Sequence, residues 1–181
     1  MRAVVITGAP GVGKTRLGHQ LVTRYDVPAA AMDCDPIVHP WNGGEEVYDL
    51  MASSVRAALP VYREWGARVV IVTGVVLAGR AYERFQKVFE ELGAEAVYYG
   101  LRADAEALAT RIENDAGGRL FVEGRLAERH LDAEVPDVPG VRLVDTTHLT
   151  LMEAADAVAA LERAELGPRW LGSSGAPTVT G

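Results

Sequence analysis

A glycine-rich segment near the amino terminus constrains this chain more than any other part of it. Residues 8–15 read Gly-Ala-Pro-Gly-Val-Gly-Lys-Thr and follow directly on the apolar run Ala3–Ile6. The spacing is that of G-x-x-x-x-G-K-[ST], in which glycines let successive backbone N–H groups turn inward around a phosphate. The helix that follows such a loop points its positive dipole end at the same anion. The segment therefore predicts a phosphate-binding loop between a strand and a helix.

The residues of this loop have distinct expected roles. Lys14 can reach the β- and γ-phosphates of a nucleoside triphosphate, and the hydroxyl of Thr15 can bind Mg²⁺. Only two of the 18 basic residues are lysines, and one of them occupies the position that the loop requires. We therefore expect ATP and Mg²⁺ as cofactors. The residues expected to bind the nucleotide here are Gly8, Ala9, Pro10, Gly11, Val12, Gly13, Lys14, Thr15 and Arg16.

Length and charge narrow the class of protein. A chain of 181 residues, 49% of them hydrophobic, can form one domain with a substantial core. Its net charge of −7 argues against nucleic acid or an anionic membrane as the main partner. No apolar run approaches the ~20 residues of a membrane span. The first expected strand starts almost at Met1, which leaves no room for a signal peptide, and the single cysteine, Cys34, fits a reducing compartment. We expect a cytoplasmic protein.

Strand-like and helix-like segments alternate along the chain, which predicts an α/β fold with a parallel sheet. The expected strands are short and apolar without alternation, as in strands covered on both faces. They are Ala3–Thr7, Pro28–Met32, Arg68–Thr73, Ala96–Leu101 and Val141–Val144. The expected helices are Lys14–Tyr25, Glu45–Trp65, Gly79–Leu92, Asp104–Asn114 and Leu151–Glu165. Asp104 is typical of a helix N-cap, and Pro60 predicts a break in the second helix.

Two segments do not fit this alternation. Residues 115–139 lie between a helix and the last expected strand, where a compact fold needs only a short connection. Glycines near the start of this segment predict a hinged, mobile lid. Residues 167–181 are rich in Gly, Ser, Pro and Thr and predict a flexible tail. We therefore expect one domain over residues 1–166, with the lid at about 115–139.

Two carboxylates follow the second expected strand, in the segment Asp33-Cys34-Asp35-Pro36. In an open parallel sheet, ligands bind at the carboxyl ends of the strands. Asp33 and Asp35 can there hold Mg²⁺ or its waters, and can orient or deprotonate an acceptor hydroxyl. The structural alternative is an Asx-turn before Pro36. The residues alone do not assign which aspartate is the base.

The third expected strand ends without the acidic residue that many phosphate-loop ATPases carry at a neighbouring strand. It ends in Thr73-Gly74 instead. This ending gives either a small, backbone-lined place for a substrate or a plain turn. The acidic role then falls to the two aspartates after the second strand.

Arginines gather around the expected lid. Phosphoryl transfer spreads negative charge over the moving group, and arginines on a closing segment can stabilise that charge. Arg119 is the candidate for a catalytic role, and Arg125 is the candidate for binding the substrate. Arg111 and Arg129 belong to the same cluster. A solvated basic surface is the alternative for all four.

Taken in order, these motifs resemble the small-molecule kinases with a phosphate loop, the group that includes shikimate kinase, gluconate kinase, chloramphenicol phosphotransferase and adenylate kinase. The resemblance rests on residues 8–15, on the D-x-D at 33–35, on Arg111 with Arg119-Leu120, and on residues 144–147 after the last strand. It covers about residues 2–165. It implies the P-loop NTPase fold, with a five-stranded parallel sheet in the order 2-3-1-4-5, flanked by helices.

The resemblance also implies roles for individual residues. It implies that Arg111 stacks on adenine and that Asp145, Thr146 and Thr147 lie near the adenine ring. It implies that Arg119 contacts the phosphates. It also implies that Asp33 lies near Mg²⁺ and that Asp35 contacts the acceptor. The chain departs from shikimate kinases where Glu45-Glu46 occupies the region of their carboxylate-binding arginine. This departure argues against shikimate itself as the acceptor.

The sequence thus favours a kinase that transfers the γ-phosphate of ATP to a hydroxyl of a small metabolite or antibiotic-like molecule. A nucleoside or nucleotide kinase is one alternative, since Trp41, Tyr48 and Tyr62 could line a pocket for a base. A nucleotide-gated regulatory ATPase is another. The expected partner is a small hydroxyl acceptor, without nucleic acid or membrane, and the chain is expected to be a monomer or a homodimer. No residue pattern names the acceptor.

Overall fold

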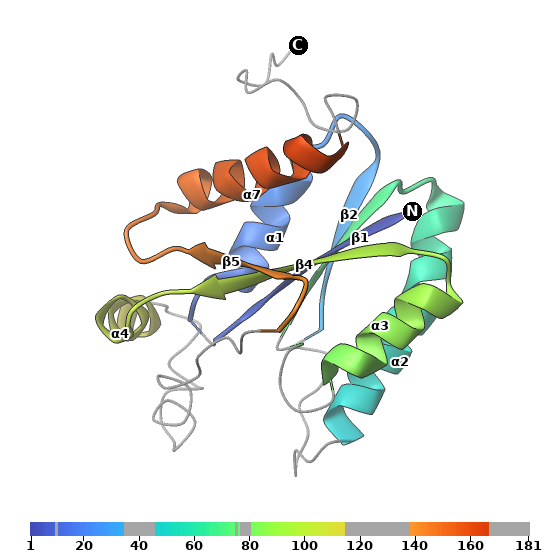
Figure 1. Cartoon of the computed structure of the whole chain (residues 1–181), viewed down its shortest axis with the longest axis horizontal. Coiled ribbons are helices and arrows are strands. Elements are labelled where there is room, and N and C mark those ends of the chain that lie inside the picture. The colour runs from blue at the N-terminus through green and yellow to red at the C-terminus, as the bar shows by residue number, and fades with distance from the viewer. Residues whose placement is uncertain (10, 35–45, 75, 77–80, 115–137, 167–181) are drawn as a thin grey trace.

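Five parallel strands form the centre of the fold in this computed structural model (Figure 1), which describes residues 1–9, 11–34, 46–74, 76, 81–114 and 138–166. The sheet has the order β2-β3-β1-β4-β5. This order and the parallel pairing confirm the topology expected from the resemblance. The strands are β1 (Arg2–Gly8), β2 (Ala29–Asp33), β3 (Val69–Thr73), β4 (Glu95–Arg102) and β5 (Val141–Asp145).

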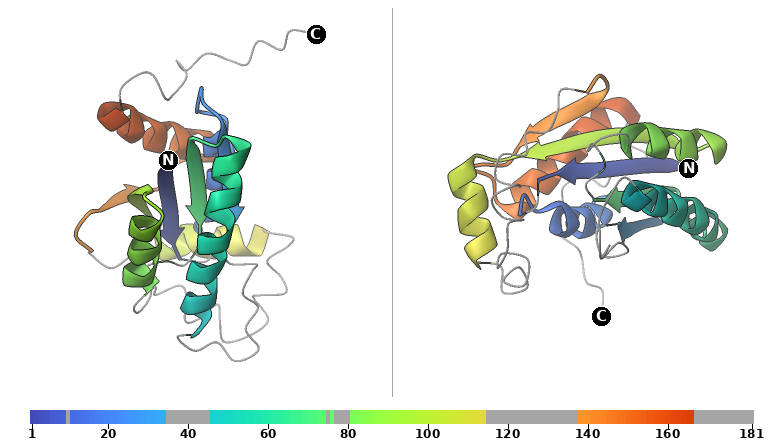
Figure 2. Two further views of the ribbon diagram at one scale, coloured as in Figure 1. Left: turned by 90° about the vertical axis from the view of Figure 1, so that its right-hand side faces the viewer. Right: turned by 90° about the horizontal axis from the view of Figure 1, so that it is seen from below.

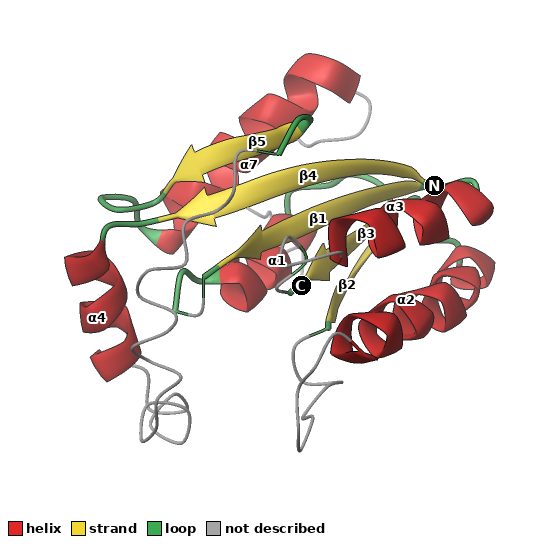
Figure 3. Cartoon of the chain, turned by 60° about the horizontal axis from the view of Figure 1, so that its bottom comes forward, coloured by secondary structure: helices red, strands yellow, loops and turns green. Residues whose placement is uncertain are grey.

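Helices cover both faces of the sheet (Figure 2), which explains the continuous apolar runs of the central strands. Every residue of β3 is buried, as are the first six residues of β1. The helices that pack beside each other are α1 with α7 on one face and α2 with α3 on the other, while α4 follows the carboxyl end of β4 (Figure 3). Their bounds are α1 (Lys14–Val22), α2 (Glu46–Trp65), α3 (Ala81–Glu91), α4 (Ala105–Asn114) and α7 (Leu151–Leu166).

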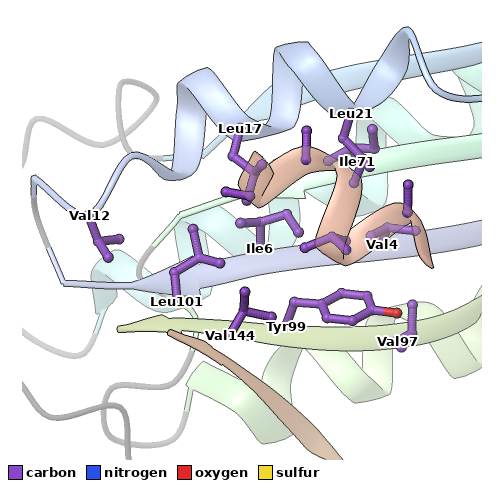
Figure 4. Close-up of a cluster of buried hydrophobic side chains, with 14 of the residues drawn as sticks. Val4, Ile6, Val12, Leu17, Leu21, Ile71, Val97, Tyr99, Leu101 and Val144 are labelled. Atoms are coloured by element: carbon purple, nitrogen blue, oxygen red, sulfur yellow. The ribbon is translucent and has the colours of Figure 1, made fainter. Parts of the chain in front are cut away.

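The core is divided by the sheet into two apolar clusters. One cluster packs α1 and α7 against the strands, with Ile6, Leu17 and Tyr99 almost completely buried (Figure 4). The other packs α2 and α3 against the opposite face, around Val55 and Phe85. Because both helix layers pack against the sheet in this way, the carboxyl ends of the strands hold the start of each following loop in a fixed position.

Of two sequence predictions about helices, one is confirmed and the other is wrong. Asp104 is the N-cap of α4, since its carboxylate accepts a hydrogen bond of 2.7 Å from the N–H of Ala107. The break expected at Pro60 is wrong, because α2 runs through this residue without interruption. Pro60 lies on the exposed side of α2, and the buried Val55 and Leu59 fix the helix to the core, so the loss of one backbone donor is tolerated.

None of the helices in the described ranges is long and apolar enough to cross a membrane. The expectations for the lid and for the tail, at about 115–139 and 167–181, fall almost entirely outside the described residues. They stay predictions.

A buried ionic network closes the amino end of the sheet, and the sequence pattern did not predict it. The guanidinium of Arg2, at the start of β1, donates to both oxygens of Glu162 on α7, at 2.7 and 3.0 Å. Glu162 has no exposed surface and also accepts from the hydroxyls of Tyr99 (2.6 Å) and Tyr25 (3.4 Å). Burial and the adjacent Glu162 carboxylate raise the pKa of both tyrosines well above its ordinary value, so both hydroxyls remain donors.

Replacing Glu162 with alanine is expected to lower the free energy of unfolding by about 3–5 kcal/mol, because the buried hydroxyls of Tyr25 and Tyr99 lose their acceptor and Arg2 loses its fully buried partner. Arg2 then keeps the more exposed carboxylates of Glu95 and Glu165. Chemical denaturation measures this loss. Asp156→Ala is the matched control on the same helix, since this carboxylate is 59% exposed in its pair with Arg24, and its expected effect is below about 1 kcal/mol. Equal effects of the two substitutions would contradict the importance of the network.

Candidate functional site

The segment between β1 and α1 has the backbone that a phosphate-binding loop requires. Gly11 and Gly13 have φ values of 80° and 98°, in the left-handed region that favours glycine. Gly13 is the N-cap of α1 without a side-chain cap. Gly8 has a positive φ of 146° and also lacks space, because a Cβ there would lie 2.4 Å from the carbonyl oxygen of Leu101 on β4. The geometry of the loop therefore explains each of its three glycines.

Lys14 lies inside this loop at the start of α1. Its side chain is buried, and its ammonium donates to the carbonyl oxygen of Ala9 at 3.3 Å. The same carbonyl accepts from the N–H of Val12 at 3.3 Å. The chain thus curls around the ammonium, and places a fixed positive charge where the loop would enclose an anion.

The next residue connects the loop to the edge of the sheet. The hydroxyl of Thr15 donates to Oδ2 of Asp33, at the carboxyl end of β2, across 2.5 Å. Residues 15 and 33 were predicted as metal ligands from separate motifs, and the structure brings their oxygens together. Magnesium is held by one or two such protein oxygens while phosphates and waters complete its shell. The Thr15–Asp33 pair of oxygens therefore fits Mg²⁺ that arrives with a nucleotide. Within the described ranges, no three His, Cys, Asp or Glu side chains group to hold a metal.

The end of β3 is packed tightly against its neighbours. The Thr73 side chain is buried, and its Cγ2 would lie 2.5 Å from a Cβ placed on Gly18 of α1. The Thr73 carbonyl accepts from the N–H of Cys34 at 2.8 Å, while the N–H of Gly74 donates to Ile6 at 3.2 Å. These contacts hold the ends of β1, β2 and β3 in place. A substrate contact of Thr73 and Gly74 stays a prediction.

A second group of predicted residues meets beyond β4 and β5. The guanidinium of Arg111, on α4, donates to the Thr146 hydroxyl at 3.1 Å and to the Thr146 carbonyl at 2.5 Å. A longer bond of 3.5 Å reaches the carbonyl of Thr147. Asp145 accepts from the N–H of Thr147 at 3.0 Å, and this bond holds the pKa of Asp145 below its ordinary value. The structure thus joins Arg111 to the segment 145–147, while the places of these residues at an adenine ring stay predictions.

Arg111 and Thr147 border a pocket of about 390 Å³. It lies at the same edge of the sheet as the glycine loop, because Gly8 pairs with Leu101 and Arg102 pairs with Asp145 in adjacent strands. The lining residues are Asp104, Glu106, Ala107, Thr110, Arg111, Thr147 and His148. Five of them, Asp104, Glu106, Ala107, Thr110 and His148, had no predicted role in the site. The N-cap at Asp104 was the available guide, since residues three and seven positions beyond it share one face of the helix.

Several predicted residues gain no structural account. Arg16 lies on the exposed side of α1. Pro10, Asp35, Arg119 and Arg125 are outside the described residues, so their expected roles stay predictions.

Gly8→Ala is expected to destabilise the fold by at least about 2 kcal/mol, because a Cβ at this position meets a backbone oxygen that cannot move aside. Gly66→Ala is the control. Gly66 also has a positive φ, of 102°, but nothing lies within 4 Å of its added Cβ, so only about 1 kcal/mol of strain is expected. Thermal unfolding compares the two variants, and similar shifts would show that the contact with Leu101 is unimportant.

Comparison with known proteins identifies the fold. No protein-family model matches the sequence, and no curated protein matches it significantly. Among solved structures, a gluconokinase from Sinorhizobium meliloti 1021 aligns with a TM-score of 0.66 at 16% identity, over 91% of this chain and 95% of that one. The APS kinase CysC of Mycobacterium tuberculosis, in complex with AMPPNP and APS, aligns with a TM-score of 0.67 at 16% identity, over 90% and 97% of the two chains. The tunicamycin resistance protein of Deinococcus radiodurans aligns at 0.58 with 20% identity, over 90% and 96%.

At these identities the likeness concerns the fold. The chain has the same α/β fold as the gluconokinase and the APS kinase, over nearly the whole length of each. One of these structures holds a nucleotide analogue, so this fold can bind a nucleotide. The resemblance seen in the sequence is confirmed at this level.

Proposed function

We propose that the protein is an ATP- and Mg²⁺-dependent kinase that transfers the γ-phosphate to a hydroxyl of a small metabolite or antibiotic-like molecule. The observation that carries the proposal is the convergence of the glycine loop, the Lys14 ammonium and the Thr15–Asp33 oxygen pair at one edge of the sheet. The neighbours support it, because they include a gluconokinase and an APS kinase in complex with AMPPNP.

The loop and Lys14 bind and neutralise the phosphates in this proposal. Backbone N–H groups of the loop, to which Pro10 contributes none, and the amino end of α1 face the anion. The Lys14 ammonium then exchanges the carbonyl of Ala9 for phosphate oxygens, which it stabilises as negative charge develops on the transferring group. No large rearrangement is needed, because the side chain already lies within the loop.

Thr15 and Asp33 would hold Mg²⁺, which supplies positive charge against the phosphate oxygens when bound. Asp33 or Asp35 accepts the proton of the acceptor hydroxyl as the hydroxyl oxygen bonds to the γ-phosphorus and the bond from that phosphorus to ADP breaks. Arg111 would stack on the base in the pocket beside α4. Arg119 would close over the transferring group, and Arg125 would contact the acceptor.

Lys14→Ala is expected to lower turnover by at least about 100-fold, because the charge that stabilises the transferring phosphate is lost. ADP release from Mg·ATP in the presence of an active acceptor measures the effect. Lys87→Ala is the matched control, since Lys87 is the only other lysine and is exposed on α3. Full turnover by the Lys14 variant would refute the proposed function.

Asp33→Asn keeps a side-chain oxygen that can accept the Thr15 hydrogen bond but removes the negative charge. We expect kcat to fall by about 100-fold or more and the Mg²⁺ concentration for half-maximal rate to rise. Titration of Mg²⁺ at saturating ATP measures both quantities. Asp156→Asn, an exposed aspartate on α7, should leave them unchanged. An unaltered Mg²⁺ dependence of the Asp33 variant would remove this residue from the metal site.

The acceptor is found by the same ADP assay with a panel of hydroxylated compounds. The panel spans sugars and sugar acids, shikimate-like acids, nucleosides, and aminoglycoside or phenicol antibiotics. Stimulation by one of the non-nucleoside classes supports the proposal and names the acceptor. Stimulation by nucleosides alone would assign a nucleoside kinase, and ATP turnover stimulated only by a protein would assign a regulatory ATPase.

A further inference from the structure

We infer that two copies of this chain associate through the outer side of α2, with the two helices packed antiparallel. The inference is independent of the proposed function, because it concerns residues outside the candidate site. It starts from the large apolar side chains that the described residues leave exposed. Three of these six lie on α2, namely Leu50, Val61 and Trp65, which are 51%, 64% and 66% exposed.

The ion pairs of α2 lie on its other side, toward α3. Asp49 pairs with Arg84 at 2.5 Å, and Arg56 pairs with Glu91 at 2.8 Å. The outer side of α2, away from α3, lies at the β2 end of the sheet (Figure 3). A surface helix normally has one apolar stripe, toward the core, and polar residues toward water. Since α2 has a second apolar stripe outside its buried side, this stripe is an interaction surface.

The residues of the outer side have the spacing of a seam between two helices. Residues that follow each other at intervals of three or four form one stripe along a helix, and two such stripes interdigitate when helices pair. The residues of this stripe on α2 are Val47, Leu50, Ser54, Ala57, Val61 and Trp65. All six are uncharged, and each is exposed or half-buried. A second helix with a matching stripe would cover them.

The order of large and small residues along this stripe matches a second copy of the same helix. When two copies of α2 lie antiparallel, Leu50 of one meets Val61 of the other, and Ser54 meets Ala57. At the ends of the seam, Val47 meets Trp65. Large apolar side chains therefore meet each other, while small residues meet at the centre. A two-fold axis near the middle of α2 makes each of these contacts twice, as in the commonest oligomers.

The size of this surface sets the strength of the association. A helix of 20 residues is about 30 Å long and about 10 Å across, so one side of α2 has a footprint of roughly 300 Å². Standard interfaces bury about 800 Å² per partner, and smaller ones belong to weak, transient complexes. We therefore expect a reversible dimer with a dissociation constant of about 1–100 µM, in place of an obligate one.

Sedimentation equilibrium of the full chain, over about 1–500 µM, tests the association on both sides of this dissociation constant. We expect the average mass to rise from that of one chain, 19.4 kDa, toward twice that value. A mass that stays at 19.4 kDa over the whole range overturns the inference but leaves the proposed function intact. Growth beyond twice the chain mass also overturns it, because a two-fold contact closes on itself.

Substitutions on the stripe test the antiparallel arrangement. Val61→Glu is expected to raise the dissociation constant at least about 30-fold, because its carboxylate would lose water against Leu50 of the second copy. The combined variant Leu50→Lys with Val61→Glu is expected to recover the original value within about 10-fold, since opposite charges then meet across the seam. Within one chain the two positions are about 16 Å apart along the helix, too far to pair with each other.

Leu161→Glu is the matched control, because it adds the same charge at an exposed apolar residue of α7, 41% exposed, outside the stripe. We expect its dissociation constant to equal that of the unmodified chain. Thermal unfolding checks that each variant is folded. Unchanged association of the Val61 variant, or no recovery in the combined variant, would overturn the antiparallel contact through α2.

Discussion

The contact between Gly8 and the carbonyl oxygen of Leu101 is the constraint on which the functional edge of the sheet depends. It leaves no space for a Cβ, so β1 can approach β4 closely enough for the glycine loop to start level with the pocket beside α4. The loop then turns through Gly11 and Gly13 into α1, whose first residues carry the ammonium and the hydroxyl. A single close approach of two backbones thus sets the relative position of the parts that would bind phosphates and base.

At the amino end of the sheet, a buried ion pair joins the surrounding elements. Glu162 joins the start of β1 to α7 through Arg2, and it joins the segment after α1 to the same helix through Tyr25. β1 and α1 are the two elements that flank the glycine loop. Their far ends therefore share one buried carboxylate, while their near ends are set by backbone geometry. A buried charge of this kind favours one arrangement of the helices, because any other would leave an ion without its partner.

Within the described residues, the strands and helices could be predicted from the sequence, because the apolar runs and the glycine motif each have one simple physical explanation. The strand order came from the resemblance and holds. The prediction of a helix break at Pro60 was wrong because helix propensity is a local property of the sequence. The burial of Val55 and Leu59, which keeps α2 continuous, is a tertiary effect. The Arg2–Glu162 ion pair could not be predicted for the same reason. Its members are 160 residues apart, and the local sequence around either residue gives no indication of the other.

The candidate site also has one part that the sequence could predict and one part that it could not. Backbone groups and a positive charge recognise phosphates, so a phosphate site can be predicted from a short run of residues that includes Lys14. A base is recognised by whichever donors and acceptors the surrounding fold leaves unused. The Thr146 carbonyl, for example, accepts from Arg111, which lies 35 residues away in the sequence. Which donors and acceptors remain available at this edge is therefore a property of the folded chain, and a short motif cannot reveal it.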